Sequence, residues 1–289
     1  MKTRQRLGGN EESSMSKQSL SQRVTAPFLR LRKQRGEKIV CLTAYTAPMA
    51  QLLDTHCDLL LVGDSLGMVV HGLPTTVGVT VEMMILHGQA VVRGSAHAFV
   101  AVDMPFGSYE RSPEQAFDTA SRILCETGAQ AVKVEAASGV ADSIAFLTGR
   151  GIPVIGHVGL RPQAVHLDGG FKARGRNEEE RQRVLEEARA TDAAGAIAMV
   201  VEGVTPELAA EITRSVSCPT IGIGASAVCD GQILVTEDML GMFDWTPKFV
   251  RRYADLRTTV MDAVGGYAQD VRSGAFPAEA EEYRLKPGK

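Results

Sequence analysis

Short apolar runs alternate with longer amphipathic segments along most of the chain. The runs are rich in Val, Ile and Leu, which is typical of strands buried on both faces of a parallel sheet. We expect strands at residues 38–44, 59–63, 98–102, 130–134, 153–157, 197–201 and 219–223, with an eighth at 233–236. Helices are expected between them at 46–56, 82–93, 113–127, 140–150, 178–194, 206–216 and 247–273.

This alternation predicts an α/β fold. Seven or eight β/α repeats in about 250 residues fit a (β/α)8 TIM barrel, and a doubly wound parallel sheet is the alternative. No linker divides the pattern, so we expect a disordered polar leader at 1–24 and a single barrel domain at 25–289. The connection at 159–177 is long and has no periodicity, which predicts a lid or an active-site wall.

Composition narrows the class of partner. The chain has 289 residues, 44% of them hydrophobic, and a net charge of −3, which argues against a general affinity for nucleic acid or an acidic membrane. Residues 1–35 are basic, and the simpler interpretation is a solvated tail followed by a basic helix. No apolar run is long enough for a membrane span, and we see no secretion signal. Five cysteines without CxxC spacing indicate a cytoplasmic protein.

Acidic residues follow four of the predicted strands. A single acid after a strand is more often a turn or capping residue, but four at matching strand ends would meet at one face of a barrel. Clustered carboxylates repel unless a cation offsets their charge, and a set of oxygen ligands favours Mg²⁺. The four acids are Asp64, Asp103, Glu135 and Glu202.

Other polar residues at the strand ends have two or more interpretations. Lys133 precedes Glu135 by two residues, so both side chains point into the barrel. Lys133 is a structural ion-pair partner, an anchor for a substrate carboxylate or a Schiff-base nucleophile. His157 is a core histidine or a substrate contact, and the glycine-rich run at 221–226 is a phosphate turn or a site of tight packing.

Several of these segments together resemble one known family. The segments are LLLVGDSLGMVVHG, AVDMPFGSY, AVKVE, GHVGLRPQAV, GGFKARGR, IGIGAS and CDGQILV, and the resemblance runs from about residue 25 to residue 277. They resemble the 3-methyl-2-oxobutanoate (ketopantoate) hydroxymethyltransferase family. The resemblance implies a barrel similar to the phosphoenolpyruvate mutase and isocitrate lyase group, with one Mg²⁺ ion at the strand ends. It also implies a homo-oligomer, commonly a decamer.

The implied reaction joins a 2-oxo acid and a folate. The one-carbon unit of 5,10-methylenetetrahydrofolate is transferred to 3-methyl-2-oxobutanoate through a stabilised enolate, which gives 2-dehydropantoate for pantothenate and coenzyme A biosynthesis. Residue by residue, the proton acceptor of the family falls on Glu202. The metal carboxylates fall on Asp64, Asp103 and Glu135, and the substrate contacts fall on Asp64, Ser65, Asp103 and Lys133. The sequence departs from the family at Ala136, Ala137 and Arg161.

Two other functions are compatible with the same pattern. A lyase or mutase of the same barrel group would use the acids to cleave or rearrange a C–C or C–P bond. A non-catalytic protein would instead bind nucleic acid through its basic N-terminal arm, with the acids in structural roles. Folate-independent cleavage would distinguish the first, and salt-sensitive nucleic-acid binding would distinguish the second.

Overall fold

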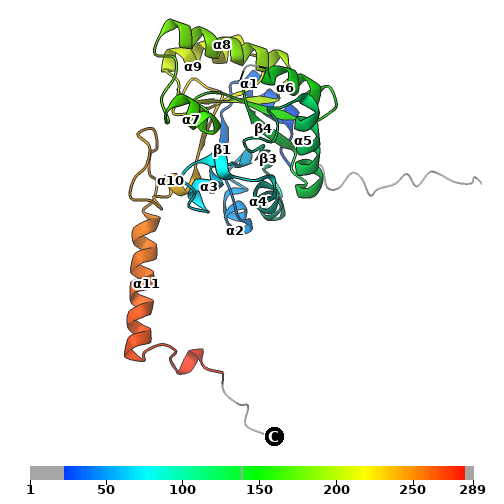
Figure 1. Cartoon of the computed structure of the whole chain (residues 1–289). Helices are drawn as coiled ribbons and strands as arrows, with labels where there is room; N and C mark the ends of the chain where they lie inside the picture. Colours follow the sequence, from blue (N-terminus) through cyan, green and yellow to red (C-terminus); the bar gives the residue numbers. More distant parts are fainter. Residues whose placement is uncertain (1–22, 138, 284–289) are drawn as a thin grey trace, which may run out of the picture.

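Eight parallel strands close into a barrel in sequence order (Figure 1). The computed structural model describes residues 23–137 and 139–283, and the strand count refers to these residues. The closed order excludes the doubly wound alternative, whose sheet is open. The strands are β1 (Ile39–Thr43), β2 (Leu59–Val62), β3 (Phe99–Asp103), β4 (Ala131–Glu135), β5 (Val154–Gly159), β6 (Ala198–Glu202), β7 (Thr220–Ile223) and β8 (Gly231–Leu234).

Helices surround the barrel. The principal ones are α1 (Ala26–Arg35), α2 (Ala47–Leu53), α4 (Val81–Gly94), α5 (Pro113–Thr127), α6 (Val140–Thr148), α8 (Glu178–Ala193) and α9 (Pro206–Ser215). Short helices α3 (Leu66–Val69), α7 (Val165–Asp168) and α10 (Thr236–Met239) lie in the loops after β2, β5 and β8. The start of α5 follows from its sequence, because Ser112 accepts a hydrogen bond from the backbone N–H of Gln115 and Pro113 occupies the first turn. In the described part of the chain, no helix has both the length and the apolar character of a membrane span.

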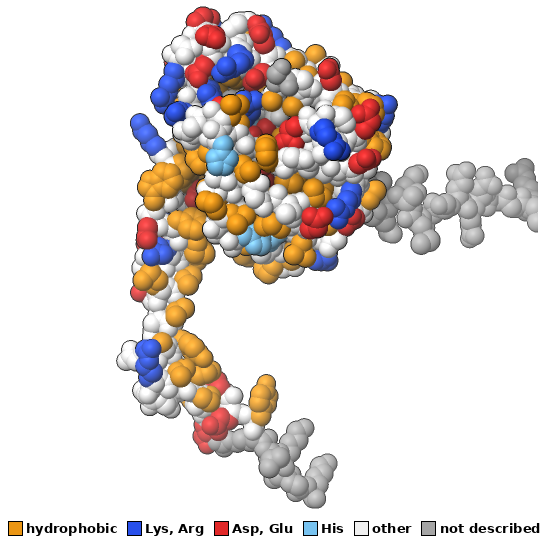
Figure 2. Space-filling model, viewed as in Figure 1, with side chains coloured by type: hydrophobic (Ala, Val, Ile, Leu, Met, Phe, Trp, Pro, Cys, Tyr) orange, Lys and Arg blue, Asp and Glu red, His pale blue; other side chains and the backbone are white. Residues whose placement is uncertain are grey.

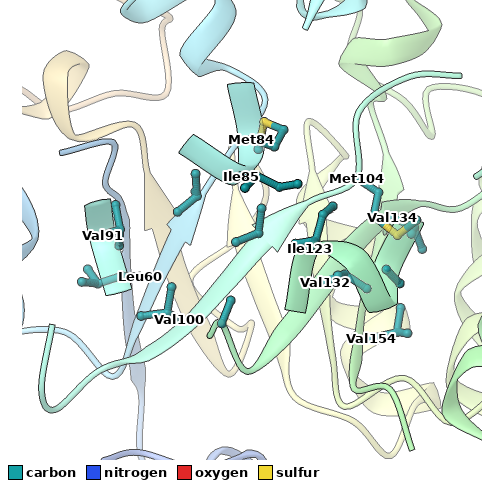
Figure 3. Packing of buried hydrophobic residues seen from close by; sticks show 14 of the residues in the cluster. Leu60, Met84, Ile85, Val91, Val100, Met104, Ile123, Val132, Val134 and Val154 are labelled. Carbon is teal, nitrogen blue, oxygen red and sulfur yellow. The ribbon is translucent and has the colours of Figure 1, made fainter. Parts of the chain in front are cut away.

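Apolar side chains fill both faces of the sheet, which explains the continuous apolar runs. In β2, Leu60 and Val62 pack against the surrounding helices, while Leu59 and Leu61 fill the barrel interior. Figure 3 shows part of this helix-facing layer, in which Leu60 lies beside Val91 of α4, and Met84 and Ile123 belong to the same cluster. Each such burial stabilises the fold by about 1.5–3 kcal/mol.

The N-terminal boundary differs from the predicted one. Residues 1–22 of the expected leader lie outside the described residues, but Arg23 and Val24 pack against the barrel. The backbone N–H of Val24 donates to the carbonyl of His97 at 2.7 Å, and Arg23 Nη1 donates to the carbonyl of Ala98 at 3.1 Å. These two residues therefore belong to the folded body and not to a leader.

The C-terminal elements also differ from the prediction. Strand β8 ends at Leu234 because Thr236, through its backbone N–H, donates to Thr43 Oγ1 and begins α10. The helix expected at 247–273 begins only at Leu256, in α11 (Leu256–Ser273), because its cap is Asp255, which accepts a hydrogen bond from the N–H of Thr258. Helix α11 projects away from the barrel (Figure 1), and none of its residues is buried within the chain.

Candidate active site

A cavity of about 810 Å³ opens at the carboxyl ends of the strands. This site cavity brings together all six residues that the sequence nominated, and His157 lines it as well. The six are Asp64, Ser65, Asp103, Lys133, Glu135 and Glu202. The convergence follows from the parallel barrel, in which every strand delivers its last side chains to the same end.

Lys133 and Asp103 form the ion pair at the base of the cavity. They are register partners on β4 and β3, and Lys133 Nζ lies 3.0 Å from Asp103 Oδ1. Only 5% of Lys133 is exposed. The other oxygen, Asp103 Oδ2, accepts a hydrogen bond from the backbone N–H of Asp64 at 3.0 Å. Both side chains are therefore fixed before any ligand binds.

Several buried acids surround this single amine, and two of them, Asp64 and Glu135, have raised pKa values. Burial and the neighbouring Asp103 carboxylate raise the pKa of Asp64 to about 7. Burial and the Asp64 carboxylate also raise the pKa of Glu135 well above its usual value. Desolvation alone would lower the pKa of Lys133, but the surrounding carboxylates outweigh it and hold that pKa above its ordinary value. A permanently charged amine is a poor nucleophile, so the Schiff-base interpretation is disfavoured.

His157 occupies the centre of the polar cluster and is 2% exposed. Burial and the nearby Lys133 ammonium lower the pKa of His157, so the ring is neutral. Its Nδ1 atom lies 3.4 Å from Lys133 Nζ, which can only donate, so the ring proton belongs on Nε2. That Nε2 atom lies 3.2 Å from Glu202 Oε2. Between the two interpretations of His157, the structure favours the one in which it belongs to the site.

Two residues of the site were not nominated from the sequence, Gln163 and Tyr109. Gln163 Nε2 donates to Asp64 Oδ2 at 2.8 Å, and its backbone N–H points at the Glu135 carboxylate, 3.2 Å from Oε2. The Tyr109 hydroxyl donates to Gln163 Oε1 at 2.7 Å and accepts from the N–H of Glu135 at 3.1 Å. Gln163 therefore donates hydrogen bonds to both Asp64 and Glu135. The Pro-Gln pair within the GLRPQAV segment is the signal that was available.

Ser65 directly follows Asp64 in the chain, and its side chain is held by a residue that comes just after β1. Its hydroxyl is 2.8 Å from the hydroxyl of Tyr45, which follows that strand. Tyr45 is almost completely buried. Ser65 is therefore a positioned group and not a freely rotating turn residue.

The 159–177 connection forms one wall of the site cavity, as predicted. Leu160, Pro162, Phe171 and Arg176 of this segment line the cavity. The segment is anchored at Arg174, whose backbone N–H donates to the carbonyl of Gly203 at 2.7 Å. Two of the departures from the family meet here, because Arg161 Nη1 donates to the carbonyl of Ala136 at 3.1 Å.

The glycine-rich run at 221–226 owes its glycines to packing. Gly224 has φ +58, and a Cβ atom there would lie 2.9 Å from Cδ1 of Phe249. A side chain at Gly222 would likewise crowd Gln232 and Cys229. Of the two interpretations of this run, close packing is the one that these contacts support.

The acids at the strand ends are candidate ligands for a metal ion. Within residues 23–137 and 139–283, no group of three or more His, Cys, Asp and Glu side chains has an arrangement that could hold a metal ion. In this structure Lys133 and Gln163 contact oxygens of Asp103 and Asp64. Asp103 Oδ1 is buried, and its cationic partner is the Lys133 ammonium at 3.0 Å. Oxygen donors with a surplus of negative charge suit Mg²⁺, which needs only one or two carboxylates beside substrate and water.

Comparison with known proteins decides the family. The family model described as ketopantoate hydroxymethyltransferase matches residues 23–279. The chain belongs to the ketopantoate hydroxymethyltransferase family. It is 68% identical over 266 residues to the 3-methyl-2-oxobutanoate hydroxymethyltransferase of Phenylobacterium zucineum, covering 92% of this chain and 96% of that protein. The protein of the same name from Maricaulis maris is 63% identical, with coverage of 94% and 99%.

Solved structures of other proteins share the fold of this chain. Phosphoenolpyruvate phosphomutase from Streptomyces platensis superposes with a TM-score of 0.57 at 13% identity, covering 86% of this chain and 88% of that one. 2,3-Dimethylmalate lyase, of the PEP mutase/isocitrate lyase superfamily, gives a TM-score of 0.55 at 16% identity, with coverage of 89% and 91%. These similarities confirm the predicted barrel type, and at this identity they carry no reaction over to the chain.

Family membership makes the chain an enzyme of group transfer in pantothenate biosynthesis. It therefore overturns the view of the acids as structural groups in a non-catalytic protein. It also sets aside the lyase and mutase alternative, which now rests on fold alone.

Proposed function

We propose that this hydroxymethyltransferase transfers the one-carbon unit of 5,10-methylenetetrahydrofolate to 3-methyl-2-oxobutanoate and releases 2-dehydropantoate. The observation that carries the proposal is the site cavity itself. One end of it holds a charged lysine among carboxylates, and Glu202 faces the same space beside a neutral histidine. A 2-oxo acid needs a cation for its carboxylate and a base for its C3 proton, and the cavity offers both.

Lys133 is the group suited to the substrate carboxylate. Its ammonium is fully charged and held by Asp103 at 3.0 Å. The Ser65 hydroxyl, which the Tyr45 hydroxyl holds in place, offers a second polar contact to the substrate. Because these groups are already in place, substrate binding requires little reorganisation.

One Mg²⁺ ion fits the acids as cofactor. Asp64 and Asp103 would hold it, with Glu135 beside them. The raised pKa values of Asp64 and Glu135 indicate a surplus of negative charge at this end of the cavity, which a divalent cation would remove. When bound, the ion supplies Lewis-acid stabilisation of negative charge on the oxygens of the oxo acid.

Glu202 acts as the base. It accepts the C3 proton of the oxo acid, and the C–H bonding pair passes into the enolate. Water adds to the methylene carbon of the folate, both C–N bonds of that carbon break, and tetrahydrofolate leaves, so that the one-carbon unit is released at the oxidation level of formaldehyde. The enolate carbon forms the new C–C bond to this carbon, the carbonyl oxygen of the one-carbon unit becomes the hydroxyl of the hydroxymethyl group, and the proton held by Glu202 is returned to that oxygen. His157 Nε2 lies 3.2 Å from the Glu202 carboxylate, so the neutral ring borders the base without adding a charge to it. Tyr109 and Gln163 keep the neighbouring acids fixed while the proton moves.

We also propose that the chain works as a cytoplasmic homo-oligomer, with a decamer as the expected form. Helix α11 carries apolar side chains that the rest of the chain leaves uncovered, and Figure 2 shows this hydrophobic surface along the projecting helix. The exposed residues are Val260, Met261, Val264, Tyr267 and Val271. A second copy is the natural cover for them. All five cysteines carry free thiols, as expected in a reducing compartment.

The test is product formation with the purified full-length chain. Mass spectrometry should detect 2-dehydropantoate from the oxo acid and 5,10-methylenetetrahydrofolate, with loss of product on chelation and recovery on addition of Mg²⁺. Glu202→Gln should lower kcat by about 10³-fold or more, since it removes the base. Glu179→Gln, an exposed glutamate on α8, is the matched control and should behave as wild type. Normal turnover by Glu202→Gln would overturn the assignment of the base.

A further inference from the structure

The site cavity is much larger than the oxo acid requires. A five-carbon acid held between Lys133 and Glu202 fills a small part of about 810 Å³, a volume in the range of sites for drug-sized ligands. The remaining space extends outward between two loops, one at 159–177 and one between α10 and α11. The side chains that line this outer part differ in kind from the charged residues at the bottom of the cavity.

Three aromatic side chains form what we call the outer wall: Phe171, Trp245 and Phe249. All three line the cavity and remain exposed, Trp245 to 75%. Large exposed aromatic surface is costly unless a ligand covers it, and flat rings suit stacking against another planar system. In Figure 2 hydrophobic surface gathers over the loop that precedes α11.

The outer wall is held in shape without a ligand. Phe249 rests on the backbone of Gly224, where no side chain fits. Arg252 Nη2 donates to the carbonyls of Phe243 and Asp244 at 2.8 and 2.9 Å, and Arg257 pairs with Asp244 at 2.6 Å. The aromatic loop is therefore preorganised, as a binding surface needs to be.

Two cationic side chains lie at the same outer part of the cavity, Arg176 and Lys248. Neither has an ion-pair partner among residues 23–137 and 139–283, although acidic residues are abundant on the surface. Unpaired cations next to aromatic planes match a ligand with a flat ring system and carboxylates.

We propose that the outer part of the cavity is the folate subsite, in which the rings of the co-substrate stack on the outer wall and its glutamate carboxylates bind Arg176 and Lys248. This inference rests on the proposed function. It places the oxo acid at the polar bottom of the cavity and the folate nearer to the mouth. The reacting methylene carbon then lies between them, within reach of the carbon that Glu202 deprotonates.

The test uses calorimetry on the full-length protein with Mg²⁺ and the oxo acid present. Tetrahydrofolate is titrated into wild type, Trp245→Ala, Trp245→Phe and the double variant Arg176→Gln/Lys248→Gln. Trp245→Ala should weaken Kd by about tenfold or more, and Trp245→Phe should stay within about threefold because it keeps a ring. Trp245 is the single tryptophan of the chain, so its fluorescence should also respond to the ligand in wild type.

The roles of Arg176 and Lys248 are tested with folates that carry different numbers of glutamate residues. The double variant should lose about tenfold or more in affinity for tetrahydrofolate triglutamate but bind tetrahydropteroate, which has no glutamate, as wild type does. Lys172→Gln removes an exposed cation of the same loop that does not line the cavity and should bind all three ligands normally. The Kd of the oxo acid, measured in every variant, should stay within about threefold and exclude misfolding.

The outcomes separate the two proposals. If wild type does not bind tetrahydrofolate, the proposed function falls. If wild type binds it and Trp245→Ala and the double variant bind it equally well, the proposed function stands and the folate subsite lies elsewhere.

Discussion

Two buried aspartates ten residues apart show how the two ends of the barrel differ. Asp54, at the amino end of the strands, accepts hydrogen bonds from the Ser95 hydroxyl and from the backbone N–H groups of Ala96, His97 and Ala98. Burial alone would raise its pKa, but these donors hold the pKa of Asp54 below its usual value. Asp64, at the carboxyl end, faces other acids, and its pKa is about 7.

The difference separates an acid that serves the fold, Asp54, from one that we propose serves the chemistry, Asp64. The amino end gives its carboxylates donors and cations, as at Arg32–Asp58 and Lys33–Asp230, both 2.9 Å apart. The carboxyl end concentrates acids around one lysine and leaves negative charge uncompensated. Such an arrangement weakens the free protein and strengthens its hold on a cation and an anionic transition state.

The largest expected effect comes from neutralising the functional aspartate. Asp64→Asn should reduce kcat by about 10³-fold, because one of the proposed metal carboxylates is lost, while the amide still accepts the hydrogen bond from Gln163. In the absence of metal at pH 8 its Tm should equal or exceed that of wild type, since one source of repulsion is gone. Steady-state kinetics and thermal unfolding measure the two quantities. A strongly lowered Tm with retained activity would reverse the roles assigned to the two ends.

The reciprocal change is Asp54→Ala. It leaves several buried donors without an acceptor, so the free energy of unfolding should fall by about 3 kcal/mol, with a Tm lowered by roughly 6–12 °C for a chain of this size. Assayed well below its Tm, the variant should keep kcat within about twofold of wild type. Thermal unfolding and the product assay test this together, and a kcat loss without a Tm loss would contradict it.

A smaller effect is expected from substitutions of Gln163, which lies in the 159–177 connection and contacts the acids. Gln163→Leu removes the donor to Asp64 and the acceptor for Tyr109, so kcat should fall by about 10–100-fold. Because Gln163 positions the acids, the Mg²⁺ concentration for half-maximal activity should rise as well. Gln163→Glu, which keeps the acceptor for Tyr109 and adds negative charge beside Asp64, should need less Mg²⁺ than Gln163→Leu. Unchanged Mg²⁺ dependence in both variants would reduce Gln163 to a packing role.

The smallest expected effect is that the stabilisation of the folded protein by Mg²⁺ depends on pH. The folded protein binds the Asp64 proton more tightly than the unfolded chain, so this stabilisation is present below pH 4 and is lost as the pH rises to about 7. Mg²⁺ replaces the proton, so the Tm gain from Mg²⁺ should be about 2–4 °C larger at pH 8 than at pH 5.5. Asp64→Asn should show a weaker trend. An equal Tm gain at both pH values would mean that the acids are not the cation site.

Most of the barrel was predictable from the sequence, because strands buried on both faces produce continuous apolar runs and parallel topology fixes where they end. The same rule identified Asp64, Asp103, Glu135 and Glu202, which meet in one cavity. The start of α11 was predicted nine residues too early, since the cap at Asp255 decides it and the apolar pattern does not.

The residues that were missed act across long separations in the chain. Gln163 reaches Asp64 from 99 positions away, and Tyr109 reaches Gln163 from 54. No local pattern encodes such contacts, since they depend on how the loop after β5 folds back over the barrel mouth. His157 was ambiguous for a related reason, because only the fold shows that its two ring nitrogens face Lys133 and Glu202.

The central claim is that the acids at the carboxyl end, with Glu202 as base and Mg²⁺ as cofactor, remove the C3 proton of the oxo acid. NMR of 3-methyl-2-oxobutanoate in deuterated water, with enzyme and Mg²⁺ but without folate, measures this step alone. The account predicts exchange of the C3 proton that requires the metal and disappears in Glu202→Gln. Exchange that persists in Glu202→Gln, or that is indifferent to Mg²⁺, would contradict it.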